Sequence, residues 1–185
     1  MDARGNDRVI VHFLGYHISN RQKKTIERAT ELALEYLVSK RLANTLDIQY
    51  HIIKDLCKKE GIFADCFCED YDRSPKFFDI RLSWTDTSDM HIVISSLCHE
   101  LIHVSQYAQR RLRHLSRSNL QAFGKEYVNI NEVKYHDLPW EKEAYEKEME
   151  VYEYVRKHMK DRYNIILREV DDKVAYVYSK KQKNK

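Results

Sequence analysis

Residues 97–107 read LCHELIHVSQY and place His99 and His103 four positions apart, with Glu100 directly after the first histidine. On a helix, positions i and i+4 lie one turn apart on the same face, so histidines at this spacing can bind one metal ion. At 100° per residue, Glu100 lies about 60° from His103, where its carboxylate reaches water on the ion without being a ligand. The stretch therefore predicts a metal-binding helix with a general base beside two ligands.

The apolar residues of this helix fall on the opposite side from the histidines: Ile94, Leu97, Leu101, Val104 and Ala108. Such a helix can bury an apolar back while its histidines face a cleft. The competing interpretation is an exposed polar helix face on which two histidines fall four apart by chance. A third ligand elsewhere in the chain would separate the two interpretations.

A catalytic zinc site uses three protein ligands and keeps one position open for water. The downstream candidates for the third ligand are His114, His136, Glu126, Glu132, Glu141, Glu143, Glu146 and Glu148. Helical periodicity separates them, because the last long helix carries an apolar stripe made of Ala144, Tyr145, Val151, Tyr152, Val155 and Met159.

Glu141 and Glu148 lie on this apolar stripe, whereas Glu143 is expected about 200° away, toward solvent. A carboxylate on a buried face is costly unless it is paired or binds a metal, so Glu141 requires an explanation that Glu143 does not. The competing explanation is that acids are favoured in the first turn of any helix, which accounts equally for both. The position of Glu141 on the inner face favours metal ligation.

The segment HELIHVSQY, followed by a Gly- and Tyr-bearing loop and then LPWEKEAYEKE, resembles a family of short zinc metallopeptidase-like proteins encoded by phages and related mobile elements. These proteins are themselves similar to the gluzincins, and the resemblance covers roughly residues 76–150. In gluzincins the third ligand is a glutamate in a Glu-x-x-Ala motif on a second helix, which corresponds here to Glu141 and Ala144. Tyr145, directly after this motif, departs from the family, because many gluzincins carry at this position an acidic or amide residue that supports a ligand histidine. Glu148 is one candidate for that support here.

The remaining periodicity predicts four strands, at 8–14, 46–53, 62–68 and 77–84. It also predicts three helices. The first covers 21–42, the second runs from a cap at Asp86, Ser88 or Asp89 to near Arg113, and the third runs from Pro139 to about 160. A loop is expected through Gly124 and residues 127–136, and the segment after 160 is either a hairpin turning at Asp171 or further helix. With the resemblance, this order implies an α+β, zincin-like fold. It would comprise a small mixed sheet with a backing helix, the HExxH helix and a second, glutamate-bearing helix.

Length and composition narrow the class of protein. The 185 residues with 43% hydrophobic content predict one domain over residues 1–185, with about 170–185 as a tail. The absence of a long apolar run predicts a protein of the cytoplasm, or of the host cytoplasm if it is virus-encoded, without membrane association. A net charge of +3 is too small to indicate a nucleic-acid-binding protein, and four irregularly spaced cysteines indicate reduced thiols.

These observations lead to one functional hypothesis and two rivals. In the first, His99, His103 and Glu141 bind one catalytic Zn²⁺, and Glu100 takes the proton of a water that attacks a protein or peptide substrate. The rivals are a non-catalytic zinc-binding interaction protein of the same fold that acts on a host protein, and a nucleic-acid-associated protein that uses the basic cluster 110–113.

Several roles remain open at this level. The residues near enough in sequence to stabilise an oxyanion are Tyr127, Tyr135, His136 and Tyr145. Gln106 either supports a ligand or is exposed. Neither the peptide sequence that would be cleaved nor the oligomeric state is predicted.

Overall fold

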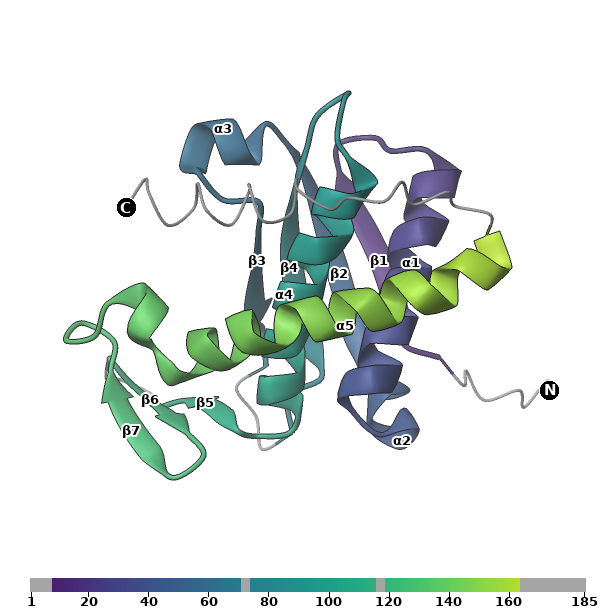
Figure 1. Cartoon of the computed structure of the whole chain (residues 1–185). Coiled ribbons are helices and arrows are strands. Elements are labelled where there is room, and N and C mark those ends of the chain that lie inside the picture. Colours follow the sequence, from purple (N-terminus) through teal and green to yellow (C-terminus); the bar gives the residue numbers. More distant parts are fainter. Residues whose placement is uncertain (1–7, 71–73, 116–118, 164–185) are drawn as a thin grey trace.

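This computed structural model describes residues 8–70, 74–115 and 119–163, and Figure 1 shows their arrangement. Along the chain the elements are β1 (Ile10–Gly15), α1 (Asn20–Leu37), α2 (Lys40–Ala43), β2 (Asp47–Lys54), α3 (Leu56–Glu60), β3 (Ala64–Cys68), β4 (Phe77–Trp84), α4 (Met90–Ala108), β5 (Leu112–His114), β6 (Leu120–Phe123), β7 (Glu126–Asn129), the 3-10 helix η1 (Tyr135–Asp137) and α5 (Pro139–Tyr163).

The larger sheet has the strand order β1-β2-β4-β3. The first three strands in this order are parallel, and β3 runs antiparallel to β4 at the edge. A second, antiparallel sheet contains β5, β6 and β7. The predicted α+β class and the small mixed sheet are therefore confirmed.

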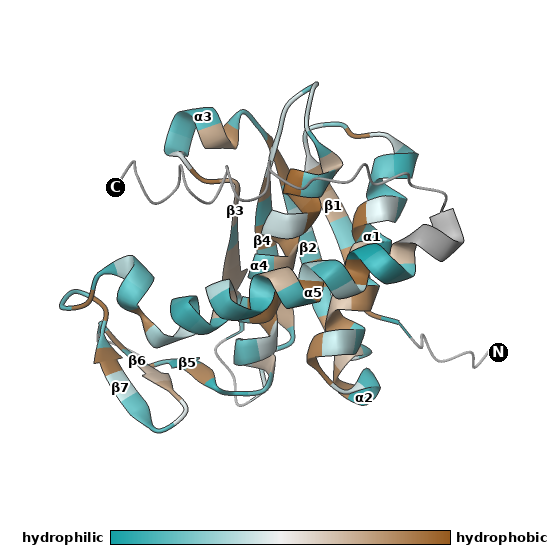
Figure 2. Ribbon diagram, viewed as in Figure 1, coloured by the Kyte–Doolittle hydropathy of each residue, from teal (hydrophilic) through white to brown (hydrophobic). Residues whose placement is uncertain are grey.

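One face of the larger sheet forms the core. Alternate residues of the two central strands point toward the helices and are buried: Ile48, Tyr50, Ile52, Phe78, Ile80, Leu82 and Trp84. Helices α4 and α1 lie on this face and contact each other, and α5 crosses over both of them (Figure 1). In Figure 2 the outward side of α5 is mostly hydrophilic, whereas brown segments gather between α4, α1 and the sheet.

Capping residues set the starts of the two long helices that cover the sheet. Ser19 caps α1 in a capping box with Gln22, and Asp89 caps α4 through a 2.9 Å bond from the His91 amide. The helix predicted over 21–42 is interrupted after Leu37, because the next residue is extended and Ser39 caps the separate helix α2. Local side-chain-to-backbone bonds here override a continuous apolar period.

The predicted end of the HExxH helix near Arg113 is wrong. Helix α4 ends at Ala108, Arg110 has a left-handed backbone conformation (φ 61°), and residues 112–114 form β5. The loop expected through Gly124 contains β7, which pairs with β6. The basic cluster 110–113 is therefore a turn and a strand start, not a helix end.

Two further predictions concern the ends of the chain and membranes. Of the segment after residue 160, for which a hairpin or further helix is expected, residues 161–163 belong to α5; the rest of it, with the tail from about 170, lies outside the described residues. Within 8–70, 74–115 and 119–163, no helix combines the length and apolar character needed to cross a bilayer.

Candidate metal centre

Helix α4 presents His99 and His103 side by side, one turn apart. Both side chains are buried, their ring centroids are 4.9 Å apart, and their Nε2 atoms are 3.3 Å apart. The apolar back of the helix predicted from the sequence is buried in full, from Ile94 to Ala108. The histidines are thus held by a rigid, internally packed helix and not by an exposed face.

The first turn of α5 brings Glu141 to the two imidazoles. Its Oε1 lies 3.3 Å from Nε2 of His103, and its Oε2 lies 3.5 Å from Nε2 of His99. Among the described residues, these three side chains form a buried group whose ligand atoms all lie within 4.8 Å of one another. The Oε2 atom of Glu141 is buried and has no hydrogen-bond partner among the described residues, which is unusual for a buried carboxylate oxygen.

The outer nitrogen of each ring fixes its tautomer. Nδ1 of His99 lies 3.2 Å from Oε2 of the buried Glu148, whose other oxygen accepts a 3.1 Å bond from the Ser95 hydroxyl. Nδ1 of His103 lies 2.9 Å from Oε1 of Gln106. A carboxylate and an amide oxygen only accept hydrogen bonds, so each Nδ1 carries the proton and each Nε2 of the neutral ring carries a lone pair.

The centre therefore gathers acceptor atoms that require a positive charge between them. Burial opposes a charged imidazole, yet the adjacent carboxylates of Glu141 and Glu148 raise the pKa of His99 to about 10. Burial likewise disfavours the Glu141 carboxylate, but the adjacent imidazoles of His103 and His99 lower its pKa to about 2. A proton on His99 balances the site without an ion, and a metal cation bound to the same Nε2 would replace that proton.

Glu100 lies beside these candidate ligands but is not one of the three converging groups. Its side chain is buried, and burial raises its pKa, while the neighbouring His99 and His103 act in the opposite direction. A carboxylate with a raised pKa next to a cation site is suited to accept and return a proton.

Aromatic rings line the same region. Tyr145 packs on His99 with ring centroids 4.8 Å apart, and His136 lies 5.7 Å from the Tyr145 ring. Burial of the hydroxyl end raises the pKa of Tyr135, as do the nearby carboxylates of Glu141 and Glu100 and a hydrogen bond to Glu141. The phenol of Tyr135 is thus directed at the centre although the residue is 49% exposed.

The four aromatic candidates for oxyanion stabilisation lie in different surroundings. Tyr127 is 69% exposed on β7 and does not share the buried surroundings of the centre. Tyr145 packs on the His99 ring, and burial and the carboxylates of Glu141, Glu148 and Glu100 raise the pKa of its phenol. The buried Nε2 of His136 has no hydrogen-bond partner among the described residues. Tyr135 differs from the other three candidates in the hydrogen bond between its side chain and Glu141.

Glu143, the other candidate for the third ligand, is directed elsewhere. Its carboxylate pairs with Arg111, whose Nη1 lies 2.8 Å from Oε1, and with Lys147. Burial disfavours its charge, but these two cations lower its pKa. The expectation that Glu143 faces solvent is wrong, since its side chain is only 15% exposed in these ion pairs. Arg111 is consequently engaged within the protein.

Comparison with known protein families, with curated proteins and with solved structures gave no match to this chain. The geometry of the site therefore carries the functional argument.

Sequence reasoning left the role of Gln106 open and did not single out Ser95 as a partner of Glu148. The sequence contained a weak signal for both residues. Ser95 is four residues before His99 and Gln106 is three residues after His103, so helical spacing places each of them near the ring of that histidine. The missing information was which residues of α5 face them. Gln106 is fully buried, so the interpretation of it as an exposed residue is wrong.

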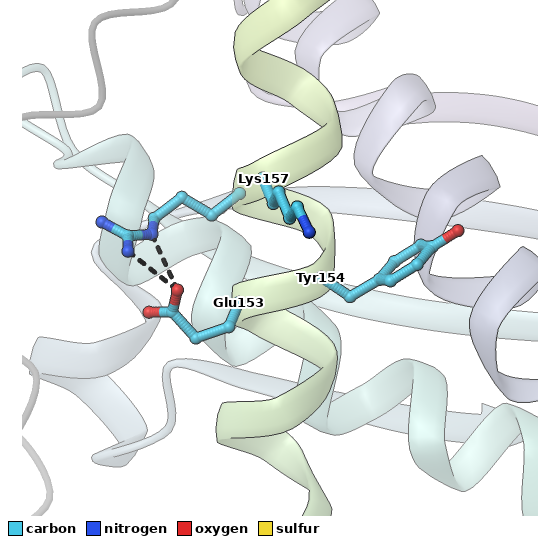
Figure 3. A pocket seen from close by; sticks show the side chains of 4 residues that line it. Glu153, Tyr154 and Lys157 are labelled. Atoms are coloured by element: carbon cyan, nitrogen blue, oxygen red, sulfur yellow. Dashed lines mark hydrogen bonds and ion pairs between the residues drawn. The ribbon is translucent and has the colours of Figure 1, made fainter.

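A hollow of about 340 Å³ farther along α5 is unrelated to this centre (Figure 3). It is lined by Glu153, Tyr154, Arg156 and Lys157. Glu153 and Arg156 pair with each other at 2.8 Å, and Tyr154 points to the other side of the helix. At a rise of 1.5 Å per residue, the hollow begins roughly 18 Å from Glu141. It offers no convergent groups comparable to those of the metal centre.

Proposed function

We propose that the protein is a zinc-dependent metallopeptidase of zincin-like fold. The observation that carries the proposal is the buried convergence of two imidazole Nε2 atoms and the Glu141 carboxylate, one oxygen of which has no hydrogen bond to any described residue. Nitrogen and oxygen donors of this kind suit Zn²⁺. Structural zinc sites are closed by four protein ligands, whereas three ligands leave the open position that catalysis needs.

The chain's own groups supply the proton transfers of peptide hydrolysis. When bound, zinc would supply a more acidic water and a Lewis acid for the scissile carbonyl. Glu100 accepts the proton of the attacking water and returns it to the leaving amine. Tyr135 donates its hydroxyl hydrogen to the carbonyl oxygen as negative charge develops there. Glu148 and Gln106 keep the two ligand rings in the tautomer that exposes Nε2.

The edge of the larger sheet supports a peptide as the substrate. Strand β3 contacts α4 and, among the described residues, pairs only with β4, so its outer edge has unpaired backbone groups. Burial raises the pKa of Cys66 in this strand, and the Glu100 carboxylate raises it further. Because β3 contacts α4, which carries Glu100, the strand lies near the proposed base. An extended peptide that pairs with β3 would pass the metal centre.

The test is metal-dependent cleavage of a mixed peptide library, followed by mass spectrometry. Protein loaded with one equivalent of zinc is expected to cut a subset of peptides, to lose this activity with a chelator, and to regain it when zinc is restored. Stoichiometric zinc binding without cleavage would favour the non-catalytic interaction protein. Failure to bind zinc at all would overturn the proposed centre.

Tyr135→Phe is expected to retain zinc and to lower kcat for a cleaved peptide by roughly 10²–10³-fold, the usual effect of removing one oxyanion donor. The ring is kept, so packing against His136 is preserved. Tyr127→Phe, which removes a hydroxyl from an exposed position on β7, is the matched control. Equal kcat values for the two variants would remove Tyr135 from the mechanism.

A further inference from the structure

Gln106 connects the HExxH helix to the helix that carries the third ligand. Its side chain is completely buried, and its amide forms bonds in both directions. Oε1 lies 2.9 Å from Nδ1 of His103, while Nε2 donates to the Trp140 carbonyl at 2.9 Å and to Glu143 at 3.4 Å. Trp140 directly precedes Glu141, so the Gln106 amide bridges one ligand and the backbone next to another.

The surroundings allow only one orientation of this amide. A flipped Gln106 would direct Oε1 at the Trp140 carbonyl and the Glu143 carboxylate, which are both acceptors. It would also direct an N–H group at Nδ1 of His103, which donates its own hydrogen in the tautomer that leaves Nε2 free for a metal ion. Arg111 and Lys147 both form ion pairs with the Glu143 carboxylate, which therefore acts as an acceptor. The amide oxygen is therefore held against His103.

The backbone around Gln106 adds to this junction. Its carbonyl accepts a 2.8 Å hydrogen bond from the Arg111 amide, and the guanidinium of the same arginine pairs with Glu143. The end of α4, the approach to β5 and the first turn of α5 are thus joined around one buried side chain. Displacing this side chain would alter the separation between Glu141 and the histidines.

The two ligand histidines are supported differently. His99 is bonded by the Glu148 carboxylate, which comes from the middle of α5. His103 is bonded by a neutral amide of its own helix, which in turn holds the start of α5. We infer that Gln106 is a positioning residue for the metal centre: it fixes the tautomer of His103 and sets the distance of Glu141 from both rings.

This inference rests on the metal site of the proposed function, but its test does not depend on catalysis. Gln106→Met keeps the length of the side chain and removes every hydrogen bond of the amide. Loss of such outer partners typically weakens metal affinity about 10–100-fold, which is the expected increase in the zinc Kd, measured by competition with a chromophoric chelator. If the methionine variant does not fold, Gln106→Asn retains the amide, is one methylene shorter, and carries the same expectation.

The matched control is Gln49→Met. Gln49 also contacts a histidine, with Nε2 2.9 Å from Nε2 of His51, but it lies on β2 and faces away from the helices. Its zinc Kd is expected to stay within about twofold of that of the unaltered protein, because outer-partner effects require contact with a ligand. In the zinc-loaded protein the His103 Nδ1–H resonance should exchange with water faster in Gln106→Met and at an unchanged rate in Gln49→Met.

A purely structural role would lower the unfolding temperature of the metal-free protein without changing the zinc Kd or this resonance. An unchanged Kd in the Gln106 variants, or an equal loss in Gln49→Met, would overturn the inference. If the unaltered protein itself bound no zinc, the proposed function would fail instead, so the two failures are distinguishable.

Discussion

Glu100→Gln is expected to bind zinc as the unaltered protein does and to hydrolyse peptides about 10²–10⁴-fold more slowly. The amide has nearly the same shape, so the buried site is preserved, but it cannot accept the proton of the attacking water. The histidines and Glu141 are untouched, and the metal content should therefore remain one ion per chain. The measurements are kcat/KM on a peptide cleaved in the library assay and metal analysis of the purified variant.

The control for this variant is Glu146→Gln, which makes the same replacement at an exposed position of α5. It should leave both cleavage and zinc content unchanged. Turnover by Glu100→Gln within tenfold of the control, at equal zinc content, would exclude Glu100 as the general base.

Glu141→Gln is expected to weaken zinc binding by more than about 100-fold, because loss of an outer partner alone costs about 10–100-fold and Glu141 is the proposed ligand itself. The variant removes the only carboxylate of the three-residue group and leaves two imidazoles to hold the ion. The zinc Kd is measured by chelator competition, and the electronic spectrum of the cobalt-substituted protein reports the change in ligand number.

Glu143→Gln is the decisive comparison, since it makes the same change two residues along the helix, at the other candidate for the third ligand. Its carboxylate is bound to Arg111 and Lys147, so its loss should change the zinc Kd by less than about tenfold, the low end of an outer-partner effect. A larger loss in Glu143→Gln than in Glu141→Gln would assign the third ligand to Glu143.

The parts of the centre that follow from helical spacing were predictable from the sequence. The four-residue separation of His99 and His103 places both on one face, and the apolar stripe of the last helix places Glu141 on its inner side. The structure brings these three side chains together. Their roles as zinc ligands remain predictions, as does the role of Glu100.

Features that depend on contacts between distant segments were not predictable. Arg110 adopts a left-handed conformation that ends α4 early, and the turn then brings Arg111 opposite Glu143. Helical periodicity alone placed Glu143 in solvent, because the periodicity of one helix contains no information about Arg111, which lies in another segment and pairs with Glu143. The same holds for Gln106, whose burial depends on where α5 begins.

The short strands β5 to β7 were missed for a related reason. They have three or four residues each, and half-buried polar residues interrupt any alternation. Such strands are stabilised by their pairing with neighbours more than by intrinsic propensity. The proposal of Tyr135 as the oxyanion donor likewise depends on a contact between distant segments, because the residue lies in η1 and its side chain bonds to Glu141 of α5.

The outer edge of β3, which is unpaired among the described residues, bears on how the proposed peptidase would choose its targets. Backbone pairing along an edge strand admits only a chain that is already stretched out, since a coiled segment keeps its own amides and carbonyls occupied. A well-folded target would first have to expose a linker or fray a terminus before cleavage. Local unfolding of the target, more than its overall sequence, would then decide where and how quickly it is cut.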